Sequence, residues 1–280
     1  MSLFLNFRKQ PVGGGLLTEP MVLRTDGSFR ASVLDLSTLQ RLIAGRSVLF
    51  GIHGYNNSQA EALCKLTRLE QALELPQSVA FLGVLWPGDS VAGFISYPVE
   101  KPTASATGQR LAKFCNKRLS GIGETSFLSH SLGARVALEA VRGLRGNTRT
   151  VILMAGAIER TCLEKEYANS FAKAESVHVL ASRKDTVLRW AFPAGNFFGQ
   201  LIDGTAWPLS AALGYAGPPK AIGKTRPPWI IDDSEDYEHG DYLPSGERKD
   251  EFPGSDKEAT WRKPATYVRR ALAGSPQTWP

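Results

Sequence analysis

The residues best suited to chemistry lie in the middle of the chain, in the segment SHSLG at 129–133. A short apolar run at 124–128 with strand character precedes it, and small and apolar residues at helical spacing follow over 134–141. A serine between strand and helix, with small residues two positions before and after it, is typical of a nucleophile elbow. The pattern therefore predicts Ser131 as a nucleophile at the positive end of the following helix.

A serine hydroxyl needs a base within hydrogen-bond reach, and the chain offers four histidines. His53 follows an apolar run, His130 lies within the elbow and is expected to point away from the neighbouring hydroxyl, and His178 sits inside a predicted strand. His239 lies in a loop after the last predicted strand and is followed by glycine. We therefore predict His239 as the base.

The base in turn needs a carboxylate to orient it. Asp185 follows the predicted strand at 176–181, where such a carboxylate is expected in a parallel sheet. The competing interpretation makes Asp185 the N-cap of a segment beginning at Val187. The other candidates for the orienting acid are Asp203, Asp232, Asp233, Asp241 and Glu159.

An oxyanion formed by attack on a carbonyl needs backbone amide donors. One donor is expected from Leu132, the residue after the nucleophile, and one from the loop HGYN at 53–56. Gly54 lets the backbone approach a substrate closely, and Tyr55 is the predicted second amide donor.

Aromatic residues concentrate at 188–219, between the predicted acid and the predicted base. This segment is expected to form a lid or one wall of an apolar acyl pocket; the alternative is that its aromatics pack a helix against the sheet. The predicted pocket residues are His53, Gly54, Trp86, Phe94, His130 and Trp190.

These groups are positioned by strands that alternate with helices from about residue 46 onward. Strands are predicted at 47–52, 78–85, 124–128, 149–155 and 176–181, helices at 59–75, 104–119, 134–141 and 257–273, and two short antiparallel strands at 20–24 and 28–33. Such alternation favours a mostly parallel sheet with helices on both faces. Ligands bind at the carboxyl ends of strands in such sheets, where the predicted site residues fall.

Composition narrows the class of protein further. The 280 residues are 42% apolar, which favours one domain over 1–280, with 188–219 as a lid or insertion and 1–17, with its three glycines, as a flexible arm. Three widely spaced cysteines predict reduced core thiols and a cytoplasmic protein.

Two classes of partner are not expected. The net charge of +6 is spread along the chain without a basic block, so nucleic acid is not a predicted partner. No apolar run approaches the 18 or so residues of a membrane span, and none is predicted. The sequence makes no prediction about oligomeric state.

Taken together, these motifs resemble the α/β-hydrolase family. They are HGYN at 53–56, Trp86-Pro87, SHSLG at 129–133, Asp185 and His239, and they span most of the chain. More narrowly, the chain is similar to a largely uncharacterised bacterial group with an HGYN oxyanion loop. The resemblance implies an eight-stranded, mostly parallel sheet, a Ser131–Asp185–His239 triad and no metal or organic cofactor. Ser129 stands where family elbows usually have glycine, and its side chain is small enough for the turn.

The expected chemistry is hydrolysis of a small carboxylic ester or thioester through an acyl-enzyme on Ser131. Two alternatives stay open at this point. One is an amidase or peptidase that acts on a small substrate, and the other is a non-catalytic module of the same fold that binds a small molecule or a protein.

Overall fold

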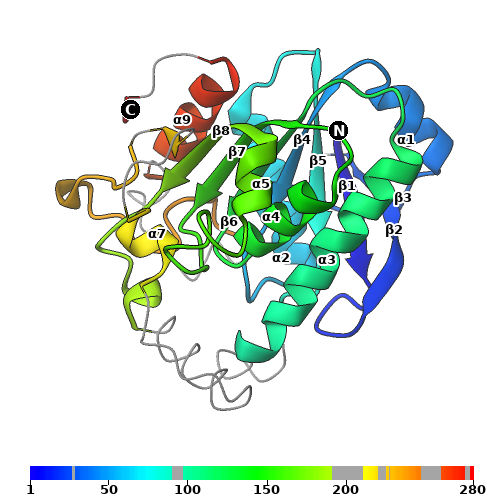
Figure 1. Cartoon of the computed structure of the whole chain (residues 1–280). Coiled ribbons are helices and arrows are strands. Elements are labelled where there is room, and N and C mark those ends of the chain that lie inside the picture. Colours follow the sequence, from blue (N-terminus) through cyan, green and yellow to red (C-terminus); the bar gives the residue numbers. More distant parts are fainter. Residues whose placement is uncertain are drawn as a thin grey trace.

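The fold is built around one twisted sheet that runs through the molecule (Figure 1). The computed structural model describes residues 1–26, 29–89, 97–190, 211–219, 225–226, 228–246, 260–274 and 278–280, with the backbone alone for 97–100. Within these residues the sheet has nine strands in the order β3-β2-β1-β5-β4-β6-β7-β8-β9. The predicted mostly parallel sheet is confirmed.

The first three strands form an antiparallel extension of that sheet. They are β1 (Ser2–Arg8), β2 (Leu16–Thr25) and β3 (Ala31–Val33). Every residue of β1 is buried, and β1 pairs with β2 on one side and in parallel with β5 on the other. The expectation of a flexible arm at 1–17 is therefore wrong for β1, because its largely apolar side chains are buried and it pairs with a strand on each side.

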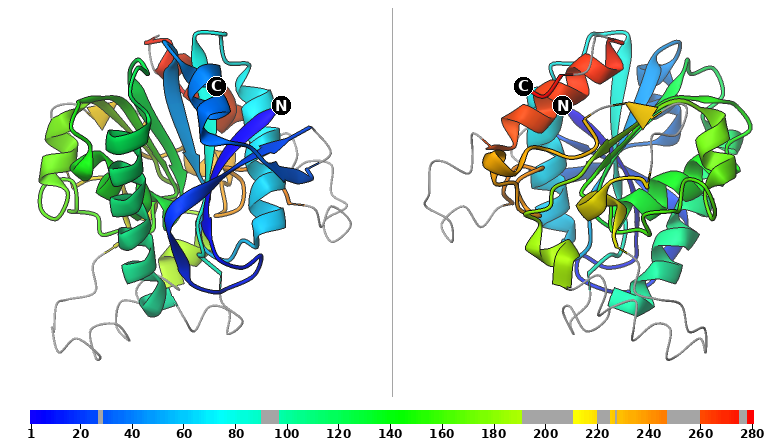
Figure 2. Two further views of the ribbon diagram at one scale, coloured as in Figure 1. Left: turned by 90° about the vertical axis from the view of Figure 1, so that its right-hand side faces the viewer. Right: turned by 60° about the vertical axis from the view of Figure 1, so that its left-hand side comes forward.

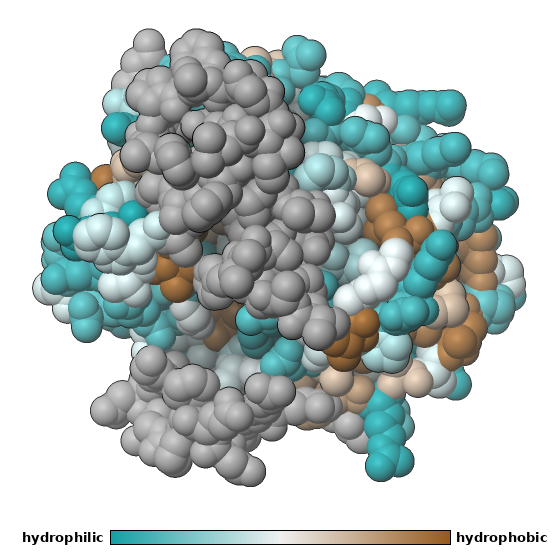
Figure 3. All heavy atoms as spheres, turned by 90° about the horizontal axis from the view of Figure 1, so that it is seen from below, coloured by the Kyte–Doolittle hydropathy of each residue, from teal (hydrophilic) through white to brown (hydrophobic). Residues whose placement is uncertain are grey.

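The remaining strands are parallel to one another and carry the site at one edge. They are β4 (Ser47–Ile52), β5 (Val79–Leu85), β6 (Thr125–His130), β7 (Thr148–Met154), β8 (Ala174–Leu180) and β9 (Thr225–Arg226). Figure 3 views the edge at their carboxyl ends; hydrophilic side chains dominate its visible described surface, with apolar ones gathered toward the right.

Helices cover both faces of the sheet (Figure 2). On one face lie α3 (Tyr97–Arg118), α4 (Gly133–Gly143) and α5 (Ala168–Lys173), and on the other lie α2 (Gln59–Leu73) and α9 (Arg262–Leu272). The shorter elements are α1 (Leu36–Ile43), α7 (Leu213–Ala216) and the 3₁₀ helix η2 (Asp233–Glu235). No helix in the described part of the chain combines the length and apolarity of a membrane span.

The structure describes only the two ends of the aromatic-rich segment at 188–219. Residues 191–210, and with them most of the predicted lid, lie outside the described residues. At its far end, α7 belongs to the core: Leu213 is fully buried, and a Cβ on Gly214 would lie 2.2 Å from the carbonyl carbon of Ala155.

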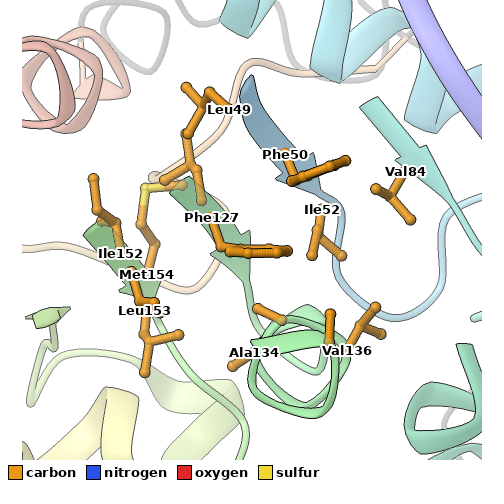
Figure 4. Packing of buried hydrophobic residues seen from close by; sticks show 14 of the residues in the cluster. Leu49, Phe50, Ile52, Val84, Phe127, Ala134, Val136, Ile152, Leu153 and Met154 are labelled. Carbon is orange, nitrogen blue, oxygen red and sulfur yellow. The ribbon is translucent and has the colours of Figure 1, made fainter. Parts of the chain in front are cut away.

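The packing beneath the elbow is dominated by two stacked rings. Phe50 of β4 and Phe127 of β6 are register partners, with centroids 5.0 Å apart, and both are fully buried. They lie on the side of α4, close to Ala134 and Val136 (Figure 4). This ring pair supports the strand and the helix that together hold Ser131.

Truncating one ring of this pair tests how much the pair contributes to the free energy of unfolding. We expect Phe127→Ala to lower the free energy of unfolding by about 3–5 kcal/mol, since it removes buried apolar surface and leaves a cavity. Urea unfolding measures the change. Val33→Ala is the control, because Val33 is 72% exposed and its truncation should cost no more than about 0.5 kcal/mol. Equal effects would contradict this assignment of the core.

His178 of β8 is a core residue, as its place in the strand predicts. It is 2% exposed, and its Nδ1 lies 2.9 Å from the hydroxyl of Tyr267 on α9. Burial, aided by the charge of Arg226, lowers the pKa of His178 to about 4. The unfolded chain therefore takes up a proton near the ordinary value of 6.5, whereas the folded chain does so only near pH 4.

This difference predicts a pH dependence of stability. Between pH 6.5 and 4 the unfolded state binds more protons, so the free energy of unfolding falls as the pH is lowered. His178 contributes about 3 kcal/mol to that fall. Urea unfolding of wild type and His178→Gln from pH 7 to 4 should show a shallower dependence in the variant. Parallel curves would contradict the prediction.

Candidate active site

Ser131 occupies a strained turn between β6 and α4. Its φ of +54° lies in the left-handed region, which costs a residue with a side chain about 1–2 kcal/mol. Backbone hydrogen bonds hold the turn: its amide donates to Met154 O at 3.0 Å and its carbonyl accepts from Ala157 N at 3.1 Å. The neighbouring Ser129 is fully buried and donates to Ile152 O at 3.3 Å, so it fits the turn as expected.

The three predicted catalytic side chains meet at this turn. His239 Nε2 lies 2.9 Å from Ser131 Oγ, and His239 Nδ1 lies 2.7 Å from Asp185 Oδ2. Since the carboxylate accepts, Nδ1 carries the proton and the Nε2 lone pair faces the serine hydroxyl. The His239 side chain is 17% exposed and that of Asp185 is fully buried.

Asp185 makes both of the contacts that its sequence position suggests. Oδ2 bonds to His239, while Oδ1 accepts from the amide of Leu188 at 2.8 Å as an N-cap. The two interpretations therefore do not compete, because each uses a different oxygen. The cap fixes the orientation of the carboxylate, and this orientation determines where the His239 imidazole can bond to it.

The segment that carries His239 has little regular structure of its own and is docked onto the loop after β8. Ser182 Oγ donates to Tyr237 O at 2.7 Å. The amide and hydroxyl of Thr186 donate to Glu238 Oε2 at 3.0 and 2.8 Å. These partners stand more than fifty positions apart in sequence, and no local pattern pointed to them.

The predicted oxyanion loop packs directly on the elbow. A Cβ on Gly54 would lie 2.8 Å from both Ser131 Cβ and His130 Nδ1, so only glycine fits there. Asn57 Nδ2 donates to the carbonyls of Gly54 and Tyr55, at 3.2 and 2.9 Å. The loop is thereby fixed next to Ser131, and the roles of the Tyr55 and Leu132 amides stay predictions.

A buried cation that sequence analysis did not single out braces this loop. Arg8, at the end of β1, is fully buried and forms an ion pair with Asp89. Its other donors reach the carbonyls of Asn57 and Trp86 at 3.1 and 2.8 Å, and those of Gln10 and Pro11 at 3.2 and 3.1 Å. All five N–H groups of the guanidinium are thus used.

Two of the predicted pocket residues have a different role. His53 and Trp86 have no exposed surface, so they do not line a pocket open to solvent. The indole Nε1 donates to His53 O at 2.9 Å, and the Trp86 amide lies 3.2 Å from His53 Nε2. Burial lowers the pKa of His53 to about 3, so the ring is a neutral brace between the loops after β4 and β5.

The other pocket candidates fall in different places. Trp190 is 67% exposed and stays a predicted pocket residue, whereas Phe94 lies outside the described residues. His130 is buried and its Nε2 donates to His239 O at 2.8 Å. It therefore contacts the base rather than an open pocket.

Two of the alternative acids bond to backbone amides elsewhere, and Asp203 lies outside the described residues. Asp232 caps Ser234 at 2.9 Å, and Asp241 accepts from the amide of Glu238 at 2.8 Å. Glu159 pairs in a backbone bridge with Ala212. Among the residues described, no group of three His, Cys, Asp or Glu is placed to hold a metal ion. The three cysteines are free and buried, as predicted.

Comparison with known protein families finds a family model that matches this chain. The model of the "alpha/beta hydrolase of unknown function (DUF900)" family matches residues 35–193, more than half of the chain. No curated protein matches.

Solved structures with detectable similarity include a gene product of unstated activity and two esterases. The Bacillus subtilis ydeN gene product is 20% identical, with 56% of this chain and 81% of that chain covered and a TM-score of 0.35. A propionate-bound thermophilic esterase, Est2 of Thermogutta terrifontis, is 9% identical, with coverage of 91% and 89% and a TM-score of 0.43. Carboxyl esterase 2 of Tuber melanosporum is 14% identical, with coverage of 96% and 91% and a TM-score of 0.40.

The family match confirms the fold that the sequence motifs predict. The turn at Ser131, the loop after β4 and Asp185 all lie within the matched residues. The chain belongs to the DUF900 family of α/β hydrolases.

Proposed function

We propose that this α/β hydrolase is a serine esterase that cleaves a small carboxylic ester or thioester through an acyl-enzyme on Ser131. The observation that carries the proposal is the continuous hydrogen-bonded chain from Asp185 through His239 to Ser131, at 2.7 and 2.9 Å. In this arrangement a neutral imidazole is already aligned to take the serine proton.

In the first half of the reaction, Ser131 Oγ attacks the substrate carbonyl while its proton moves to His239 Nε2. Asp185 accepts the Nδ1–H bond and stabilises the imidazolium that results. The amides of Leu132, at the N-terminal end of α4, and Tyr55 donate to the oxyanion. His239 then returns the proton to the leaving alcohol or thiol as the acyl-enzyme forms.

In the second half, water enters and His239 Nε2 takes its proton. The hydroxide equivalent attacks the acyl carbon, the same amides hold the second oxyanion, and Ser131 leaves with the proton from His239. A carboxylic acid is released and the free enzyme is restored. The proton transfers use Asp185, His239 and Ser131, which are already within hydrogen-bond reach of one another, so no rearrangement of the base is required.

A covalent probe tests the nucleophile. Intact-mass analysis with a fluorophosphonate should add one label to wild type and none to Ser131→Ala or His239→Ala, because attack needs both the hydroxyl and its base. Ser129→Ala is the matched control: it removes a serine hydroxyl two residues away that bonds to Ile152 O, and it should label at the wild-type rate.

The same experiment separates the alternatives. A folded wild type that takes no label would contradict the proposal and favour a non-catalytic binding module. A labelled enzyme that hydrolyses short acyl amides faster than the matching esters would replace the esterase with an amidase.

The orienting acid has a test of its own. Asp185→Asn should lower kcat by about 10⁴-fold, since the amide no longer holds the imidazole in the reactive tautomer. Asp232→Asn is the control, because that exposed carboxylate caps Ser234 away from the triad, and its kcat should stay near that of wild type. A kcat for Asp185→Asn within about tenfold of wild type would contradict this role.

A further inference from the structure

His130 contacts the backbone of the proposed base, whereas Asp185 contacts its ring. Its Nε2 lies 2.8 Å from the backbone carbonyl of His239. A carbonyl only accepts, so Nε2 carries the hydrogen and Nδ1 of a neutral ring keeps a lone pair. Nδ1 has no hydrogen-bond partner within the described structure and faces Gly54, whose added Cβ would lie 2.8 Å away.

The two imidazoles also pack against each other. Their ring centroids are 4.9 Å apart at an angle of 47°, and the ring of Tyr242 lies 6.2 Å from His130 on the same cluster. His130 is 8% exposed. Burial, and then the positive charge that His239 can carry, hold the pKa of His130 well below its ordinary value. The ring is therefore neutral and does not repel an imidazolium at His239.

We propose that His130 is a positioning residue that fixes the peptide and ring of His239 over Ser131. The inference rests on the proposed function of the triad. It assigns to the elbow residue directly before the nucleophile a role outside the triad and the oxyanion donors: the elbow carries both the nucleophile and the group that holds its base. The distance between His239 Nε2 and Ser131 Oγ is then set by His130, a neighbour of Ser131 in the elbow, as well as by Asp185.

Two amide variants separate this role from mere filling of space. In His130→Gln the side-chain NH₂ reaches about as far as Nε2 and can still donate to the carbonyl of His239. In His130→Asn the same group stops near the position of Nδ1 and falls short. We expect His130→Gln to keep kcat within about threefold of wild type, and His130→Asn to lower it 10- to 100-fold, as roughly ångström-scale misplacement does. KM should change by less than about twofold in both, because His130 is not in contact with substrate.

A second readout does not depend on turnover. The Nδ1–H of His239 bonded to Asp185 should give a downfield proton resonance in wild type and His130→Gln, and this resonance should be weakened or lost in His130→Asn. Nitrogen-15 spectra of wild type should also show His130 as the neutral Nε2–H tautomer. This last measurement stands even if a variant fails to fold.

The outcomes distinguish the two proposals. Equal kcat in the Gln and Asn variants, an unchanged resonance in both, or an Nδ1–H tautomer for His130 would overturn the positioning role. If folded wild type takes no fluorophosphonate label, the esterase proposal fails, whereas loss of the resonance in His130→Asn alone would still support the positioning of His239 by His130.

Discussion

The backbone of the loop after β4 lies against the turn after β6 with no side chain between them. A Cβ on Gly54 would lie 2.8 Å from Ser131, and one on Gly133 would lie 2.5 Å from His53 O. Gly54 in the loop and Gly133 beside the turn therefore allow the two backbones to approach each other closely. That approach brings Ser131, the proposed nucleophile, against the loop that carries the second predicted oxyanion donor, and the rest of the candidate site is arranged around it.

The loop after β4 must be held in this position. The buried guanidinium of Arg8 does so through its ion pair and hydrogen bonds. Burying a guanidinium costs several kcal/mol unless its donors are satisfied. Arg8 satisfies all five, four on carbonyls of three separate segments and one on Asp89. Lys65 adds a bond to Asn57 Oδ1 at 2.6 Å. Because these bonds form only when the segments are correctly placed, the geometry of the loop after β4 is fixed by folding and does not await a ligand.

The sequence predicted the parts of the fold whose signals are local. The apolar run at 47–52 coincides with β4, and the turn chemistry around Ser131 was readable because small residues at fixed offsets are required there. The place of β1 was not readable, since a lone apolar run does not say which strands will pair with it, and the glycines that follow suggested an arm.

Among the site residues, local position singled out Asp185 after a predicted strand and His239 in a late loop, but their long-range partners could not be predicted. Thr186 and Glu238 are 52 positions apart, and Arg8 and Asp89 are 81 apart. Each is an ordinary polar residue in its own neighbourhood. The burial of His53 and Trp86 was missed for the same reason: each looks like a loop residue beside a site until the other is stacked on it, with ring centroids 5.6 Å apart.

The placement of the base in an irregular segment follows from what a base must do. A histidine on one of the parallel strands would project from a face of the sheet, as His178 does, and would be buried beneath a helix. A segment that crosses the edge of the sheet can instead place an imidazole next to the serine hydroxyl. Ordering such a segment costs conformational entropy. Here the bonds from Ser182, Thr186 and His130 offset that cost, and they bind the residues immediately around and including His239. Rigidity is thus concentrated where the imidazole must be held.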